Sequence, residues 1–215
     1  MTNLVADIET TVEEYPDATA IAANGRETTY EEFWSRTGRF AAALSEQGFE
    51  SGDRVALYLP NVPQFLTAFH GVLRAGGVVV PMNPQYKSRE ISHLLADSEA
   101  TVVVSLGDLV PRVEAVMDDT DVTQVVSVGE TQEENDTVTP FEAFLAEEEA
   151  PVVSRPDDDV AIQPYTSGTT GRPKGVLLTH RNVAWDARAS ASLMEGGSKR
   201  VISSSASCPC SISTA

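Results

Sequence analysis

The alternation of strand and helix patterns that decides the fold is clearest in residues 52–84, which read GDRVALYLPNVPQFLTAFHGVLRAGGVVVPMNP. The stretch 54–59, hydrophobic after Arg54, ends at Pro60 and predicts a strand. From Pro63 onward the apolar side chains recur at helical spacing until a pair of glycines, and residues 78–80 then form a second, valine-rich run. The stretch therefore predicts a strand, a helix and a second strand in succession.

The same alternation continues on both sides of this unit. Upstream, Thr29 and Glu32 form a capping box that opens a helix, and Gly48 closes it. Downstream, the pattern predicts a helix near 89–96, a strand at 101–104, a helix near 110–117 and a strand at 125–128. Valine-rich strands separated by helices are typical of a mostly parallel sheet flanked by helices, so we expect an α/β fold.

Residues 130–159 are expected to form an acidic linker. Its first part, 130–150, holds eight acidic residues around the apolar group Phe141, Phe144 and Leu145. A charge run of this kind is usually solvated, and the apolar group predicts one short helix that docks on the rest of the domain. The segment is therefore interpreted as a soluble connection rather than a functional site.

The charge balance excludes one class of partner. Fifteen basic and 32 acidic residues give a net charge of -17, and so negative a surface repels nucleic-acid phosphates. The only lysines are Lys87, Lys174 and Lys199. Acid-rich, lysine-poor usage predicts a halophilic protein, because about 1 M salt shortens the Debye length to about 3 Å and screens the repulsion. An ordinary acidic surface is the alternative.

Other features bear on the compartment and on metals. No apolar run approaches the roughly 20 residues of a transmembrane helix, and the N-terminal residues lack a secretory signal, so we expect a cytoplasmic protein. Cys208 and Cys210 are too few and too close to form a disulfide framework. His70, His93 and His180 lack the paired spacing of a metal site. They are interpreted as surface or packing residues, and the metal ligands stay unknown.

The segment that carries chemistry is a polar loop between two predicted strands, 160–165 and 176–178. Its glycines permit positive φ and close approach of a ligand, its hydroxyls supply hydrogen-bond donors, and a lysine adds a point charge. It is not a Walker A loop, because Pro173 and Gly175 flank that lysine. The residues alone leave open a flexible hairpin without a ligand. The candidate phosphate-binding residues are Thr166, Ser167, Gly168, Thr169, Thr170, Gly171 and Lys174.

The string YTSGTTGRPKGVLLTH, residues 165–180, resembles the signature of AMP-forming acyl-CoA synthetases in the adenylate-forming superfamily, and among them the long-chain fatty-acid CoA ligases. Two further stretches are similar to that family, GDRVALYLPN at 52–61 and AGGVVVPMNP at 75–84. The resemblance implies an incomplete N-terminal AMP-binding domain over residues 1–200, with its phosphate loop at 165–175.

The resemblance also implies a two-step reaction. A fatty acid reacts with ATP to give acyl-AMP and pyrophosphate, and coenzyme A then displaces AMP to form a thioester. ATP, Mg2+ and coenzyme A would therefore be required, and the partners would be small molecules. In that family the loop lies over the β- and γ-phosphates, where Lys174 would balance negative charge.

The family's remaining apparatus, including its adenine loop, ribose-binding aspartate and C-terminal lysine, would follow later in the sequence. We therefore expect no intact catalytic residue and an inactive chain. The alternative is a non-catalytic fragment or interaction module with weak nucleotide binding.

The last 15 residues, 201–215, differ in composition from the rest. They include six serines and both cysteines and carry no charged side chain. Regrouping their codons in the neighbouring frame, with free synonymous choice, permits D-L-F-L-S-V-L-P-L-F-H-I-Y-G, which resembles the family's continuation. An interrupted reading frame near Arg200 is therefore predicted, with an aberrant tail after it. A genuine flexible serine-rich tail is the alternative.

Overall fold

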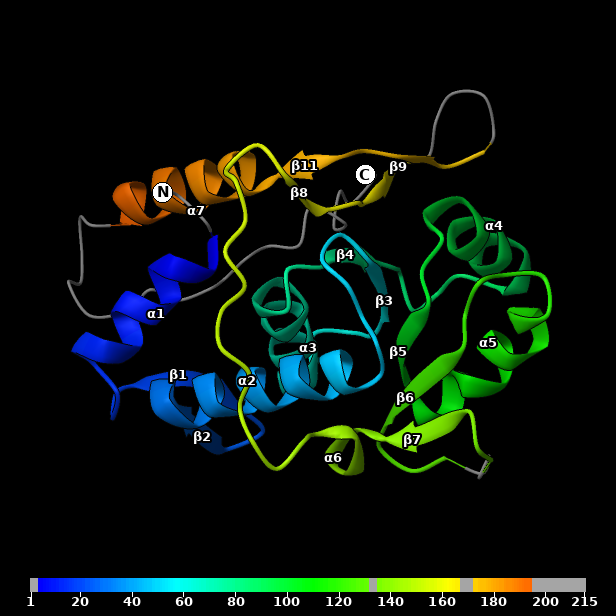
Figure 1. Ribbon diagram of the computed structural model, residues 1–215, viewed down its shortest axis with the longest axis horizontal. Coiled ribbons are helices and arrows are strands. Elements are labelled where there is room, and N and C mark those ends of the chain that lie inside the picture. The colour runs from blue at the N-terminus through cyan, green and yellow to red at the C-terminus, as the bar shows by residue number, and fades with distance from the viewer. Residues whose placement is uncertain (1–3, 132–134, 167–171, 195–215) are drawn as a thin grey trace.

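A computed structural model describes residues 4–131, 135–166 and 172–194, with side chains up to residue 190. The described residues build a seven-stranded sheet that is parallel except for the antiparallel strand β11 at one edge (Figure 1). Across the sheet the strands are β11 (Leu178–Thr179), β8 (Val160–Ile162), β4 (Val78–Pro81), β3 (Arg54–Tyr58), β5 (Val102–Leu106), β6 (Gln124–Val128) and β7 (Val138–Pro140).

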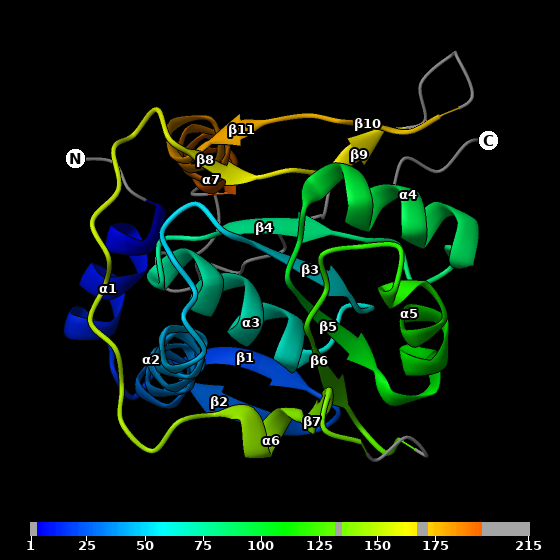
Figure 2. The ribbon, with the colours of Figure 1, turned by 45° about the vertical axis from the view of Figure 1, so that its right-hand side comes forward.

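Helices cover both faces of this sheet (Figure 2). One face packs against α1 (Leu4–Glu14), α2 (Tyr30–Glu46), α3 (Pro63–Arg74), the short α6 (Phe141–Phe144) and α7 (His180–Met194). The other face packs against α4 (Ser88–Ser98) and α5 (Val110–Met117), which a short 3-10 turn at Gly107–Leu109 precedes. The expected α/β class with a mostly parallel sheet is confirmed.

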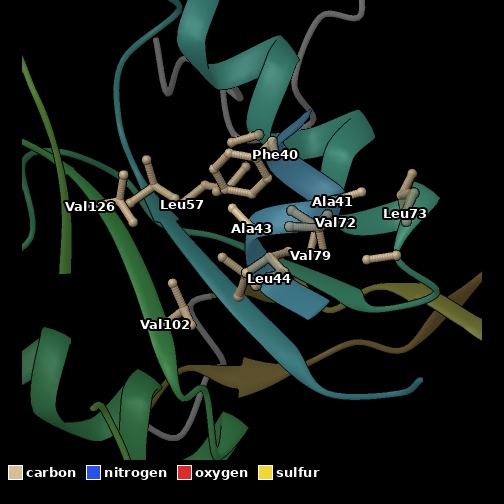
Figure 3. Packing of buried hydrophobic residues seen from close by; sticks show 14 of the residues in the cluster. Phe40, Ala41, Ala43, Leu44, Leu57, Val72, Leu73, Val79, Val102 and Val126 are labelled. Atoms are coloured by element: carbon tan, nitrogen blue, oxygen red, sulfur yellow. The ribbon is translucent and has the colours of Figure 1, made fainter. Parts of the chain in front are cut away.

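The central strands send alternate side chains into the two layers. Val55 and Leu57 of β3 lie in the cluster under α2 and α3, whereas Ala56 and Tyr58 lie in the cluster under α4 and α5. All four are fully buried. Figure 3 shows Leu57 in the first cluster beside Phe40 of α2. Burial on both faces explains why these strands read as continuous apolar runs.

The helix α2 begins as the capping box predicts. The backbone N–H of Glu32 donates to Thr29 Oγ1, and the backbone N–H of Thr29 donates to Glu32 Oε2, both at 3.2 Å. These reciprocal bonds satisfy two donors that would otherwise lack partners at the start of a helix. Gly48, just past the helix, has a φ of 81°, the left-handed conformation that favours glycine.

The acidic segment exposes its glutamates at 147–149, while its apolar residues pack on the rest of the domain. The expected docking helix is present as α6, and its rings reach the core, with Phe141 and Phe144 5.6 and 5.2 Å from Phe40 between ring centroids. Farther along, Arg39 Nε donates to the carbonyl of Ala146 at 2.6 Å. Apolar side chains and backbone hydrogen bonds therefore hold residues 144–153 against the domain. This segment forms a strap across α2 and α3.

A buried guanidinium fastens this strap. Arg74, at the end of α3, is 5% exposed, and its Nε donates to the carbonyl of Ala150 at 2.8 Å. Its Nη1 donates to the carbonyl of Trp34 at 2.9 Å, and the guanidinium lies 4.4 Å from the centre of the Trp34 ring. Gly38 makes the room, because a Cβ there would lie 2.8 Å from the Arg74 guanidinium.

Several elements were not predicted. The helix α1 precedes an antiparallel hairpin of β1 (Thr19–Ala23) and β2 (Arg26–Thr29). The turn of this hairpin is Asn24–Gly25, and both residues have positive φ, as a two-residue hairpin turn requires. Bidentate hydrogen bonds from Arg188 to Asp7 tie α7 to α1, at 3.0 and 2.7 Å.

The strands predicted around the polar loop are shorter than expected. The stretch 160–165 is divided, because β8 ends before Pro164 and a separate strand begins after it. The apolar run at 176–178 is not one strand: Val176 and Leu177 lie between two short strands, and their side chains are exposed. In the described ranges, no helix combines the length and the apolar character needed to cross a membrane.

His70 on α3 provides a test of the packing between α2 and α3. Its ring lies 5.4 Å from the Phe33 ring and 5.1 Å from the Phe69 ring, and its buried Nδ1 has no hydrogen-bond partner among the described residues. Burial lowers the pKa of His70 from 6.5 to about 4. The unfolded chain therefore takes up a proton first as the pH falls.

We expect the contribution of His70 to the free energy of unfolding to be complete above pH 6.5 and to decline toward pH 4, with a loss of about 3 kcal/mol. Urea unfolding of the parent and of His70→Leu at pH 7 and pH 4.5 measures this. The variant should lose less stability than the parent on acidification, because the proton uptake of His70 on unfolding is removed. Equal losses would show that His70 is not held neutral by the fold.

Candidate functional site

The polar loop leaves the sheet through a short hairpin. Its strands are β9 (Tyr165–Thr166) and β10 (Lys174–Gly175), paired antiparallel with Lys174 opposite Thr166. The hairpin follows the carboxyl end of β8, which pairs in parallel with β4. Figures 1 and 2 both place it beside α4. Ligands of α/β proteins bind at the carboxyl ends of parallel strands, so the hairpin stands where a ligand site is expected.

The hairpin brings two of the seven predicted phosphate-binding residues together. Thr166 and Lys174 are opposite each other and both are exposed. A hydroxyl and an ammonium group so placed can donate to the same phosphate. The other five, Ser167, Gly168, Thr169, Thr170 and Gly171, lie outside the described residues, and their role stays a prediction.

A chain of buried and partly buried hydrogen bonds connects the hairpin to the sheet and to α4. Arg54 Nε donates to Gln163 Oε1 at 3.0 Å, and Gln163 Nε2 donates to the Tyr165 hydroxyl at 3.0 Å. The Tyr165 hydroxyl in turn donates to Asp97 Oδ2 at 2.6 Å. The chain thus runs from a guanidinium to a carboxylate, and every hydrogen in it has a defined direction. Burial, with the bond to Asp97, raises the pKa of Tyr165, so its hydroxyl stays protonated.

Sequence reasoning missed this chain of contacts. Arg54, Asp97 and Gln163 come from β3, α4 and the end of β8, and no spacing in the sequence relates them. The one local signal is Gln163, a polar residue between apolar neighbours and 5% exposed. Buried polar groups need partners, so its position could have indicated a network without naming the other members.

Gly175 is a glycine because the network leaves it no room. A Cβ at this position would lie 2.9 Å from Gln163 Nε2 and 3.4 Å from the Tyr165 ring. Any larger residue would have to displace an amide that hydrogen bonds hold on both sides. The glycine therefore allows β10 to approach the buried amide closely.

His93 and His180 occupy different surroundings in the fold. His93 of α4 donates from Nε2 to the carbonyl of Pro173 at 3.0 Å, since a carbonyl can only accept. His180, at the start of α7, is fully buried, and neither ring nitrogen has a partner among the described residues. Burial and the nearby Arg155 charge lower the pKa of His180. Within the same residues, no group of three His, Cys, Asp or Glu side chains could hold a metal ion.

Comparison with known proteins gives the family. The family model described as AMP-binding enzyme matches residues 8–210. The chain belongs to the AMP-binding enzyme family. The match takes in the whole hairpin and the predicted loop between its strands. The predicted aberrant tail at 201–215 lies outside the described residues and stays a prediction.

Individual relatives agree with this assignment. The chain is similar to a long-chain-fatty-acid–CoA ligase of Bacillus subtilis, 32% identical over 195 residues, covering 79% of this chain and 35% of the relative. It is 36% identical over 171 residues to a feruloyl-CoA synthase of an Amycolatopsis species, covering 80% of this chain and 32% of the relative. The chain thus spans about a third of the length of these AMP-binding enzymes.

Solved structures extend the likeness to three dimensions. A crystal structure of a long-chain-fatty-acid-CoA ligase from Archaeoglobus fulgidus matches with a TM-score of 0.78 and 32% identity, covering 91% of this chain and 40% of that protein. An anthranilate CoA ligase in complex with anthranoyl-AMP matches with a TM-score of 0.81 at 23% identity, covering 86% of this chain and 36% of the other. The second likeness shows a shared fold alone.

Gly175→Ala tests the close approach of β10 to the network. The added methyl group should displace the Gln163 amide and destabilise the protein by about 1–2 kcal/mol, measured as a shift of the urea midpoint. The matched control is the same substitution in a Gln163→Ala background, where the obstructing amide is absent and the added cost should be smaller. An equal cost in both backgrounds would show that contact with Gln163 is not the reason for the glycine.

Proposed function

We propose that this chain is the N-terminal part of an AMP-forming acid–thiol ligase that activates a fatty acid with ATP and transfers it to coenzyme A. The observation that carries the proposal is the hairpin, which places Thr166 opposite Lys174 at the two ends of the family's signature loop. The relatives named above act on different acids, but both names describe the joining of an acid to coenzyme A. A fatty acid is proposed because several relatives are long-chain-fatty-acid–CoA ligases.

In the first step, the carboxylate of the acid attacks the α-phosphorus of ATP. A new bond forms between the carboxylate oxygen and phosphorus, the bond to the bridging oxygen breaks, and pyrophosphate leaves with the negative charge. The Lys174 ammonium and the Thr166 hydroxyl would donate to phosphate oxygens as that charge increases. This role is electrostatic, so it needs no nucleophile from the described residues.

In the second step, the sulfur of coenzyme A forms a bond to the acyl carbon, the bond from that carbon to the phosphate oxygen of AMP breaks, and AMP and the thiol proton leave. We assign no residue of the described part of the chain to this step. The chain spans about a third of its relatives' length, so the activity is proposed for a protein of the family's full length.

The described part of the chain has no binding site made of protein ligands for the proposed Mg2+, because no three His, Cys, Asp or Glu side chains meet there. These residues do not fit a resident metal centre. Magnesium commonly binds through substrate phosphates with few protein ligands, so we assign it to the nucleotide, and no step is assigned to a metal held by these residues.

The function is tested by the exchange of pyrophosphate into ATP in a family-length protein that carries this segment. Exchange should depend on added fatty acid, and Lys174→Ala should lower its rate about 100-fold, because one charge-stabilising donor is lost. Thermal stability should hardly change, since Lys174 is exposed. Arg172→Ala is the matched control, because it removes an exposed cation from the same hairpin and should cost much less.

Two results would contradict the proposal. Equal exchange rates in Lys174→Ala and the parent would remove Lys174 from the reaction. Pyrophosphate binding without any fatty-acid-dependent exchange would instead favour a nucleotide-binding module that is not a ligase.

A further inference from the structure

The helix α4 contacts both stems of the hairpin. His93 and Asp97 are four residues apart, so they lie one turn apart on the same face of this helix. His93 donates to the carbonyl of Pro173, which directly precedes β10. Asp97 accepts from the hydroxyl of Tyr165, the first residue of β9. One face of one helix therefore holds the entry and the exit of the loop.

The hairpin needs such support because it is very short. Among the residues that the structure describes, its two strands pair at two positions, Lys174 with Thr166 and Gly175 with Tyr165. An isolated two-stranded hairpin is marginally stable at best in water, and so short a one is weaker still. The positions of its exposed side chains must therefore be fixed by contacts with the rest of the protein.

The support itself is firmly anchored. On its other faces α4 buries Ile91, Leu94 and Leu95, which have no exposed surface and lie in the cluster under the sheet. The bond from Tyr165 to Asp97 is short and ends on a carboxylate, which makes it among the stronger hydrogen bonds in a protein. Because α4 is itself held in place, its hydrogen bonds can fix the position of the hairpin.

We infer that His93 and Asp97 are positioning residues, which set Thr166 and Lys174 at the spacing that phosphate requires. This inference rests on the proposed function, because it assumes that the hairpin binds phosphate. Neither residue needs to touch the ligand. His93 acts through the peptide bond that joins Pro173 to Lys174, and Asp97 acts through Tyr165, whose next neighbour is Thr166.

The first test is calorimetric titration of the 215-residue chain with inorganic pyrophosphate. His93→Leu and Asp97→Ala should each weaken binding about tenfold, which is the effect of losing one well-formed hydrogen bond. The conservative variants should recover most of the loss: the side-chain amide of His93→Gln can still donate to Pro173, and Asp97→Asn can still accept from Tyr165. If these side chains contributed through packing alone, the variants that keep a hydrogen bond would not bind pyrophosphate more tightly than those that lose it.

The second test needs no ligand. The backbone amide of Val176 donates to the carbonyl of Pro164 at the base of the hairpin. In His93→Leu and in Asp97→Ala, hydrogen exchange at this amide should become about tenfold faster. The amide of Val78, which donates to the carbonyl of Asp53 within the sheet, is the reference and should not change.

The two tests separate the inference from the proposed function. If the parent does not bind pyrophosphate, the proposed phosphate role fails for this chain, and exchange at Val176 alone decides whether α4 positions the hairpin. If exchange at Val176 is unchanged in both His93→Leu and Asp97→Ala, the inference is wrong. It is also wrong if these variants bind pyrophosphate as the parent does, or if His93→Gln is as weak as His93→Leu.

Discussion

The burial of the central strands on both faces is the constraint on which the rest of the structure depends. Each of these strands must supply apolar side chains in both directions, as Val55 and Ala56 do on β3. The middle of the sheet is therefore mostly apolar, with the small hydroxyls of Ser105 and Ser127 among its buried polar groups. Most of the polar chemistry lies at the ends of the strands, where the backbone leaves the two layers of helices, and the hairpin with Lys174 stands at such an end.

The parts of the fold that sequence could predict are those with local causes. A capping box made by Thr29 and Glu32 marks a helix start without reference to anything distant. A hydrophobic run that ends at Pro60 marks a strand in the same way, and a helical pattern that ends at a glycine pair marks a helix. In the acidic segment, the apolar group at 141–145 indicates a docking helix, but the sequence does not indicate the residues against which that helix packs. Phe141 meets Phe40 only once the chain has folded back over α2.

The candidate site divides in the same way. Thr166 and Lys174 are predicted from local features, the hydroxyls, glycines and lysine of one loop, and from the resemblance of that loop to a known signature. The residues that hold them are not predicted, because Arg54, Asp97 and Gln163 come together only through the order of the strands. The glycine of the signature has a physical reason as well, since Gly175 leaves space for a buried amide that belongs to a different element.

The strap at residues 144–153 has a consequence for the order of assembly. It carries the chain from β7, at one edge of the sheet, to β8, near the opposite edge, and it crosses the layer of α2 and α3 on the way (Figure 1). The Arg74 guanidinium that fastens it can receive the Ala150 carbonyl only after α3 has docked beside Trp34. Contacts between segments so far apart in sequence are costly to form early, so we expect the strap, β8 and the hairpin to be added late in folding. The hairpin that is proposed to bind ATP is then among the last parts of the chain to acquire its shape. It can form its site only after the helices and the sheet beneath it have packed together.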